Sequence, residues 1–181
     1  MCPMTDLPAH ELTRLASVAA GSDLERLIER RRAGEPLQYL EGTAPFGPLD
    51  LVVDPRVLIP RPETEQLWEL ASSALGDAGP GTAIVDLGTG SGALALALKH
   101  AFPQAQVYGT DLSGDALDVA LDNGRRLGLE VEFLQGDLFE ALPSRLRGRI
   151  DLLVSNPPSV AAGEWDALPA DVRHEPRDAL V

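Results

Sequence analysis

The chain of 181 residues is poor in basic residues, in cysteine and in long apolar runs. Its 15 lysines and arginines face 28 aspartates and glutamates, so the formal charge is −13. A surface that acidic repels a phosphate backbone, which weighs against a general nucleic-acid binder. The single cysteine, Cys2, excludes an intrachain disulfide and is typical of a reducing compartment. We therefore expect a cytoplasmic protein.

Membrane and metal sites are also not expected. The longest apolar run is far too short to span a bilayer, and no signal-peptide pattern opens the chain. The histidines, His10, His100 and His174, stand too far apart to suggest a group of metal ligands. The composition, 44% hydrophobic and 24% charged, is that of a protein with a packed core.

The first part of the chain is predicted to be helical. Residues 22–34 form an amphipathic segment that Ser22 and Asp23 would cap and Gly34 would end. Its basic run, residues 30–32, falls where cations complement the helix dipole, so we interpret it as a solvated last turn. Turn residues and alternating apolar positions predict a small β-hairpin within residues 42–60.

A second amphipathic helix is predicted to begin at Pro62, which suits a first helical position. Glu63 and Glu65 follow in the first turn, where negative charge is favoured. The apolar residues then recur at helical spacing, which predicts one buried face. That face would consist of Leu67, Leu70, Ala71, Ala74 and Leu75.

From residue 82 onward, strands and helices alternate. Strands are predicted at 82–88, 106–111, 131–137 and 150–156, and helices at 93–102 and 116–127. Nearly continuous apolar strands in such an alternation predict an α/β fold, with a parallel sheet that helices cover on both faces.

A glycine-rich loop, "DLGTGSG", follows the first of these strands and opens a helix. Glycines at this place let the backbone turn tightly and approach a ligand, beside a helix N-terminus that favours anions. The motif alone is ambiguous, because Gly88, Gly90 and Ala93 also satisfy the relaxed dinucleotide pattern. The candidate ligand-binding residues are Asp86, Gly88, Thr89, Gly90, Ser91 and Gly92.

The next strands also end in polar residues. Asp111 lies about where an acidic residue grips ribose hydroxyls, Asp137 ends the third strand, and Asn156 ends the fourth. Because the carboxyl ends of parallel strands line the ligand crevice, we expect these side chains to share one edge with Asp86. Pro157 and Pro158 stiffen the backbone after Asn156 and end the strand.

Together, these motifs resemble the class I methyltransferases that use S-adenosylmethionine, and more narrowly the HemK/PrmC family of release-factor N5-glutamine methyltransferases. The matching stretches are "RRRAGEPLQYLEGTAPFG", "VDPRVLIPRPETE", "DLGTGSGALALAL", "GTDLSGDALDVALDN", "DLLVSNPP" and "VRHEPRDAL".

The resemblance implies a Rossmann-like class I sheet and a role for each matching position. The loop from Gly88 to Gly92 would hold the methionine part of S-adenosylmethionine, and Asp111 would bind its ribose. Asp137 and Leu138 would flank the adenine. Asn156 would border the cofactor as well as the substrate. It and a carbonyl of Pro157 or Pro158 would accept hydrogen bonds from the substrate glutamine, which belongs to the Gly-Gly-Gln motif of a peptide chain release factor.

The chain departs from this family at two points. Ser159 stands where family members carry an aromatic residue that packs on the substrate amide. The family also has a larger helical N-terminal domain and a sheet of more strands. We therefore interpret residues 1–41 as the remnant of that domain, 42–60 as a hairpin linker and 61–181 as a partial methyltransferase domain. Its fourth strand would leave an apolar edge, which would lower stability or lead to dimerisation.

Three other functions compete with this one. N6-adenine methyltransferases share an Asn/Asp-Pro-Pro-aromatic motif, although Ser159 and the charge of −13 weigh against nucleic acid. A non-catalytic S-adenosylmethionine-binding relative fits the short chain and Ser159. An NAD-dependent dehydrogenase explains Asp111 but gives Asn156 no role.

Overall fold

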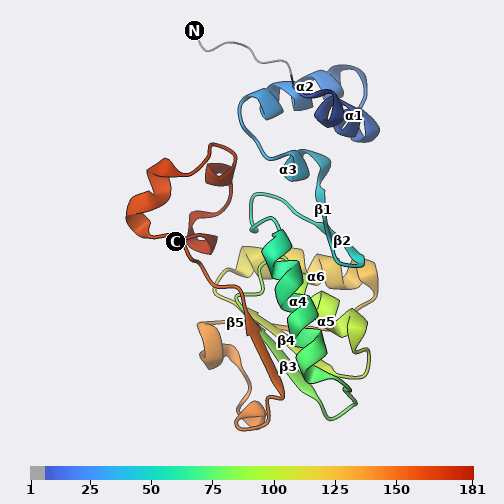
Figure 1. Cartoon of the computed structure of the whole chain (residues 1–181), viewed down its shortest axis with the longest axis vertical. Helices are drawn as coiled ribbons and strands as arrows, with labels where there is room; N and C mark the ends of the chain where they lie inside the picture. Colours follow the sequence, from blue (N-terminus) through green and yellow to red (C-terminus); the bar gives the residue numbers. More distant parts are fainter. Residues whose placement is uncertain (1–6) are drawn as a thin grey trace.

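The computed structural model describes residues 7–181, so Cys2 lies outside the described part. Helices at the N-terminus lead through a hairpin into an α/β unit, and the C-terminal segment returns to the loop that joins the hairpin to the next helix (Figure 1). None of the helices within residues 7–181 is long and apolar enough to cross a membrane.

Three helices form the N-terminal part: α1 (Ala9–Val18), α2 (Gly21–Arg32) and α3 (Leu37–Glu41). They enclose a small core of Leu15, Leu37 and Leu40. The predicted cap of α2 is wrong, because the helix begins at Gly21 after an extended Ala20 without a side-chain cap. Its predicted end is confirmed, since Gly34 follows with a φ of 97°.

The basic run at the end of α2 is only partly solvated. Arg30 pairs with Glu35 at 2.5 Å, and Arg31 pairs with Glu11 at 2.8 Å. Because Glu11 belongs to α1, the latter pair joins the first two helices. Arg30 and Arg31 are thus engaged by carboxylates, so the predicted solvated turn is right only in part.

The hairpin pairs β1 (Thr43–Phe46) with β2 (Leu49–Val52) in antiparallel register, as predicted. The second sheet holds β3 (Ala83–Leu87), β4 (Gln106–Asp111), β5 (Glu132–Gln135) and β6 (Leu152–Ser155), all parallel, in the order β5-β4-β3-β6. The intervening helices are α4 (Pro62–Leu75), α5 (Ala93–Ala101) and α6 (Gly114–Leu127). Short 3-10 turns follow at Leu138–Ala141, Ser144–Leu146, Ala162–Ala167, Val172–His174 and Arg177–Ala179. The predicted α/β fold is confirmed.

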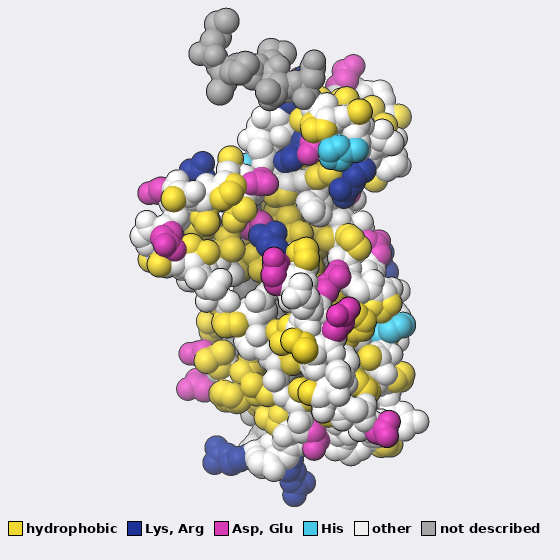
Figure 2. Space-filling model, viewed as in Figure 1, with side chains coloured by type: hydrophobic (Ala, Val, Ile, Leu, Met, Phe, Trp, Pro, Cys, Tyr) yellow, Lys and Arg dark blue, Asp and Glu magenta, His cyan; other side chains and the backbone are white. Residues whose placement is uncertain are grey.

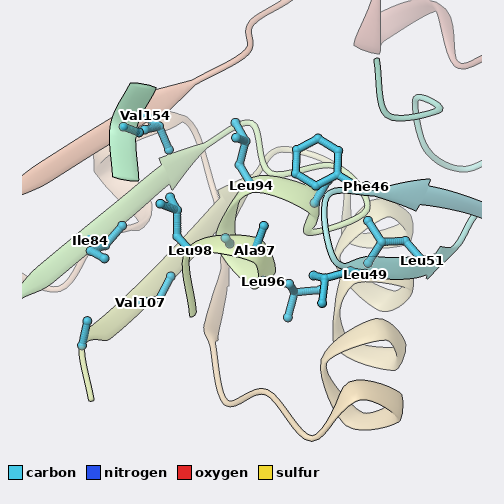
Figure 3. Close-up of a cluster of buried hydrophobic side chains, with 14 residues drawn as sticks. Phe46, Leu49, Leu51, Ile84, Leu94, Leu96, Ala97, Leu98, Val107 and Val154 are labelled. Atoms are coloured by element: carbon cyan, nitrogen blue, oxygen red, sulfur yellow. The ribbon is translucent and has the colours of Figure 1, made fainter. Parts of the chain in front are cut away.

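The main core lies between one face of this sheet, helix α5 and the hairpin. Ile84, Val107 and Val154 point from three strands toward Leu94 and Leu98 of α5 (Figure 3). The opposite face carries a smaller cluster, in which Val85 and Tyr108 meet Leu146 of a 3-10 turn. No α-helix among residues 7–181 contributes to that second cluster. The expectation of helices on both faces is therefore wrong.

Helix α4 buries most, but not all, of the predicted face. Pro62 occupies the first turn as expected, but Leu70 is 69% exposed and Ala74 is exposed as well. Leu67, Ala71 and Leu75 pack in the core as predicted, and Trp68 joins them. Periodicity thus identified the helix and most of its buried face, but it included Leu70 and Ala74 and left out Trp68.

Strand β6 is the last strand of the sheet on its side. It pairs only with β3 among the described strands, and its Leu153 is 44% exposed. Hydrophobic side chains gather over this side of the molecule in Figure 2. The apolar edge expected from the sequence is thus present in the described chain.

One buried amide connects the two sheets. Asn123 of α6 is fully buried, and its carboxamide accepts from the Val52 N–H at 2.7 Å and donates to the Val52 carbonyl at 3.0 Å. Its Nδ2 also donates to the carbonyl of Ser91, in the glycine-rich loop, at 3.0 Å. The hairpin and the loop are therefore held by the same side chain.

Candidate functional site

The ends of the four parallel strands lie at one edge of the sheet, as predicted. Leu87 is in register with Thr110 and with Ser155, and Asp111 is in register with Gln135. The polar segments that follow each strand therefore start side by side. This edge is the candidate functional site.

The glycines of the loop serve two different purposes. Gly88 and Gly90 have φ of 71° and 54°, and a Cβ on either would meet nothing within 4 Å. Gly92 has a φ of 83°, and a Cβ there would lie 3.0 Å from Leu96 and 3.2 Å from Phe133. The first two glycines thus face open space that a ligand can occupy, whereas Gly92 allows helix α5 to pack closely.

Asp86 is 1% exposed and holds the glycine-rich loop through hydrogen bonds. Its Oδ2 accepts from the Thr89 hydroxyl at 2.6 Å and from the Ala95 N–H at 3.2 Å. Its Oδ1 is buried without a hydrogen-bond partner among the described residues. A buried carboxylate oxygen of this kind needs a hydrogen-bond donor, and an ammonium group bound at the loop would supply one.

Asp86 is expected to make stability depend on pH. Burial raises its pKa from 3.8 to about 6. Between these values the folded chain holds a proton that the unfolded chain has released. The free energy of unfolding should therefore fall as pH rises from 4 to 6, by about 2 kcal/mol. Chemical denaturation across this range should show a flatter profile in Asp86→Asn. Asp118→Asn, at an exposed position on α6, serves as the control and should keep the slope; a parent protein with no slope would contradict the assignment.

Asp111 holds the other side of the loop. Its Oδ2 accepts from the Gly90 N–H at 2.9 Å, and its Oδ1 accepts from the Ser113 N–H at 2.9 Å. A carboxylate has about four lone-pair positions, so both oxygens can still accept from a pair of ligand hydroxyls. The role in ribose binding stays a prediction, and the contact with Gly90 adds a structural one.

The side chains of Thr89 and Ser91 are turned away from the crevice. Both are buried, at 6% and 3% exposure, and the Thr89 hydroxyl is used by Asp86. Any contact with a ligand would therefore come from their backbone. Their predicted place in the binding loop stays a prediction.

The ends of β4 and β5 carry an exposed apolar rim, which comprises Leu112, Leu138 and Phe139. These side chains are 68%, 52% and 57% exposed. The two strand ends are joined, since the Gly136 N–H donates to the Asp111 carbonyl at 3.0 Å. Leu138 has a φ of 44°, a strained conformation for a bulky side chain. Such a rim suits a flat heteroaromatic group.

Sequence reasoning identified Asp137 and Leu138 but missed Leu112 and Phe139. Asp137 lies beyond the end of β5 and is exposed, with no side-chain cap to the turn that follows. Leu112 could have been found because it is an apolar residue directly after the aspartate that ends a strand, where no core can cover it.

Asn156 follows β6 and is exposed, as are Pro157, Pro158 and Ser159. Its Nδ2 donates to the hydroxyl of Thr64, in the first turn of α4, at 3.1 Å. The backbone after the prolines is held too, because the N–H groups of Ser159 and Val160 donate to the carbonyl of Leu180 at 3.1 and 2.8 Å. The segment is thus fixed at both ends.

The C-terminal segment is docked by one buried carboxylate. Glu175 is 5% exposed, and its Oε2 accepts from the Ile59 N–H at 3.0 Å. Its Oε1 accepts from the Arg61 guanidinium at 2.5 Å. Residues of "PRPETE" and "VRHEPRDAL" therefore contact each other, which connects two of the motifs recognised in the sequence.

The site offers acceptors and apolar surface but no metal centre. Within residues 7–181, no group of three or more histidine, cysteine, aspartate or glutamate side chains could hold a metal ion. The open glycine loop, the unpartnered Asp86 oxygen, Asp111 and the apolar rim together fit a nucleoside that carries a cationic group. Asn156 stands at the neighbouring strand end.

The chain belongs to the methyltransferase small domain family, whose family model matches residues 69–170. That range contains the sheet, the glycine-rich loop and the Asn156 segment.

Among curated proteins, the chain is similar to those named release factor glutamine methyltransferase. The relative from Moorella thermoacetica is 50% identical over 169 residues, which cover 92% of this chain and 58% of the relative. The relative from Bordetella pertussis is 49% identical over 157 residues, which cover 86% and 57%. The resemblance stated from the sequence motifs is therefore confirmed. The chain spans somewhat more than half the length of these relatives.

A solved structure supports the fold assignment. The chain is similar to a Thermus thermophilus 16S rRNA N2 G1207 methyltransferase in complex with AdoMet and guanosine, with 27% identity and a TM-score of 0.56. The match covers 67% of this chain and 33% of that one. The sheet described above is thus a class I methyltransferase sheet.

Proposed function

We propose that the chain carries the cofactor site and the amide-binding site of an S-adenosylmethionine-dependent methyltransferase that acts on a glutamine side chain of a protein. Its proposed substrate is the glutamine of the Gly-Gly-Gln motif in a peptide chain release factor, in line with the relatives' name, release factor glutamine methyltransferase. We further propose a cytoplasmic setting, because translation termination takes place there.

The fit to S-adenosylmethionine rests on the chain's own residues. Gly88 and Gly90 leave room for the methionine part, and the unpartnered Oδ1 of Asp86 lies beneath that loop. Asp111 would accept from the ribose hydroxyls, and Leu112 and Leu138 would cover the adenine. When bound, the cofactor supplies an electrophilic methyl group on a sulfonium sulfur.

The observation that carries the proposal is the hydrogen bond from Asn156 to Thr64. Since Nδ2 is used as the donor, Oδ1 is left to accept from a substrate. An amide nitrogen is a poor nucleophile because its lone pair is delocalised into the carbonyl. Acceptors on its N–H groups, Asn156 and a proline carbonyl, would fix it in line with the methyl group and favour the positive charge that develops on nitrogen. Positioning contributes at best about 7–11 kcal/mol.

Methyl transfer to an intact release factor and to a Gly-Gly-Gln peptide tests the proposal. Labelled S-adenosylmethionine should transfer its methyl group to glutamine, as located by mass spectrometry of the fragments. Calorimetry with S-adenosylmethionine should show binding. Binding without transfer would instead support a non-catalytic relative, and no binding would refute the cofactor site.

Ser159→Tyr is expected to raise turnover. Ser159 is exposed beside the proline corner and offers no flat surface for the substrate amide. Stacking on an aromatic ring contributes about 1–3 kcal/mol in nucleic-acid systems, which corresponds to roughly 5- to 150-fold in rate. Initial rates on the Gly-Gly-Gln peptide measure the effect, and Ser159→Leu controls for added bulk. A tyrosine variant no faster than the parent would refute the stacking argument.

Methylation of a nucleic-acid amino group is the second candidate, and the similarity to an rRNA methyltransferase favours it. Enzymes of that kind stack an extruded base on an aromatic residue. Ser159 offers none, and the charge of −13 opposes a phosphate backbone. A gel shift with RNA or DNA at moderate salt should show no complex; a stable one would favour this candidate.

We also propose that the described chain dimerises through β6. The strand leaves backbone groups open beside Leu153, which is a template for pairing with a second copy. Light scattering at micromolar concentration should give the mass of a dimer, and Leu153→Lys should give a monomer. A monomeric parent protein would contradict this.

A further inference from the structure

The Asn156 carboxamide needs an orienting contact. It is exposed at the end of β6, and the rotation of an asparagine amide about its last bond is broad, with two orientations of nearly equal shape. One orientation presents an oxygen to the substrate and the other presents an NH₂ group. Only the first can accept from the N–H of a substrate amide.

Thr64 can select the first of these two orientations of the Asn156 amide. Its side chain is 8% exposed, and its hydroxyl accepts from Asn156 Nδ2 across 92 positions of the chain at 3.1 Å. A threonine has few side-chain rotamers because it is branched at Cβ. The hydroxyl is therefore held in one place on the helix.

The first turn of α4 is itself fixed on both sides. The Thr64 N–H donates to the Arg61 carbonyl at 3.0 Å, and the Arg61 guanidinium is held by the buried Glu175. Further along the helix, Leu67 and Ala71 pack in the main core, to which Val154 of β6 also belongs. Helix and strand thus share one core, and the distance between Thr64 and Asn156 is set by packing.

We propose that Thr64 is a positioning residue, which holds the Asn156 carboxamide with Nδ2 toward α4 and Oδ1 toward the substrate. The catalytic consequence rests on the proposed function, whereas the orientation itself does not. This gives the "PRPETE" segment its role: Arg61 docks the C-terminal segment through Glu175, and Thr64 orients the amide.

Kinetic comparison of three variants tests the consequence. Thr64→Val keeps the shape of the side chain and removes the acceptor, so kcat for Gly-Gly-Gln methylation should fall about 3- to 10-fold. Thr64→Ser should restore it. Ser72→Ala is the matched control, because the Ser72 hydroxyl lies on the same helix, buried without a partner among the described residues. It should leave kcat unchanged.

A double-mutant cycle separates orientation from a general structural role. Thr64→Val should have no further effect in an Asn156→Ala background, because no amide is left to orient. A structural role of Thr64 would persist in that background, and equal effects in both backgrounds would overturn the proposal.

The side-chain NH₂ signal of Asn156 in a ¹H–¹⁵N NMR spectrum provides a readout without activity. Its proton that faces Thr64 should shift upfield in Thr64→Val and return in Thr64→Ser, with no change in Ser72→Ala. An unchanged signal in Thr64→Val would refute the inference. If the parent chain methylates no glutamine, the proposed function fails, and the NMR result still decides whether Thr64 orients the amide.

Discussion

Replacing Asn156 with alanine is expected to lower methyl transfer to a Gly-Gly-Gln peptide about 100- to 1,000-fold, the loss typical of removing one preorganised hydrogen-bonding group at a developing charge. The alanine variant has no oxygen to accept from the substrate N–H, while the two prolines still hold the backbone. Both kcat and kcat/KM should fall, because the interaction strengthens as charge develops on nitrogen.

The control for this variant is cofactor affinity. Asn156 follows β6, which pairs with β3, but the glycine loop and Asp111 stay in place in this variant, so calorimetry should still show binding of S-adenosylmethionine. Asn156→Asp should fall between the alanine variant and the parent, since it keeps an acceptor but loses the donor to Thr64. Full activity in Asn156→Ala would show that the amide is bound elsewhere.

Replacing Glu175 with alanine is expected to lower the free energy of unfolding by roughly 3–4 kcal/mol, since it orphans a buried N–H and a partly buried guanidinium. The affected groups are the Ile59 N–H and Arg61, whose side chain is 32% exposed. Chemical denaturation measures the loss. Because Leu180 also holds Ser159 and Val160, turnover should fall together with stability.

Glu175→Gln is the matched control, because glutamine keeps an acceptor for the Ile59 N–H and removes only the charge opposite Arg61. The free energy of unfolding should fall about half as much in Glu175→Gln as in Glu175→Ala, because hydrogen bonds to charged groups are stronger than those to neutral groups. Limited proteolysis should cut within residues 160–174 in the alanine variant first. Equal stability of Glu175→Ala and the parent would mean that the segment is docked by its other contacts alone.

The sheet was predictable because each strand carries its own signal. The apolar runs are short, turn residues bound them, and a parallel arrangement brings their ends to one edge. The edge of the buried face of α4 was not predictable: Leu67 and Leu70 are equally apolar, yet Leu67 packs in the core and Leu70 is exposed, because the shape of the core decides which of them is covered. The apolar spacing also could not predict that 3-10 turns cover the second face of the sheet, because a turn of three or four residues is too short to show a repeat.

The site was predictable where it depends on strand ends, and unpredictable where it depends on contacts between distant segments. Asp86, Asp111 and Asn156 follow from their places after strands. The contacts of Thr64 with Asn156 and of Glu175 with Ile59 span 92 and 116 positions. Nothing in the local sequence of either partner specifies the other, so the motifs were recognisable while their physical connection was not.

The buried carboxamide of Asn123 has a consequence for association between chains. By engaging both the N–H and the carbonyl of Val52, it pairs with β2 as a residue of a neighbouring strand would. The backbone groups of Val52 are therefore not available to a strand of a second chain, whereas those at the outer edge of β6 are. We therefore expect Asn123 to keep the strand of a second chain from pairing with the hairpin at Val52.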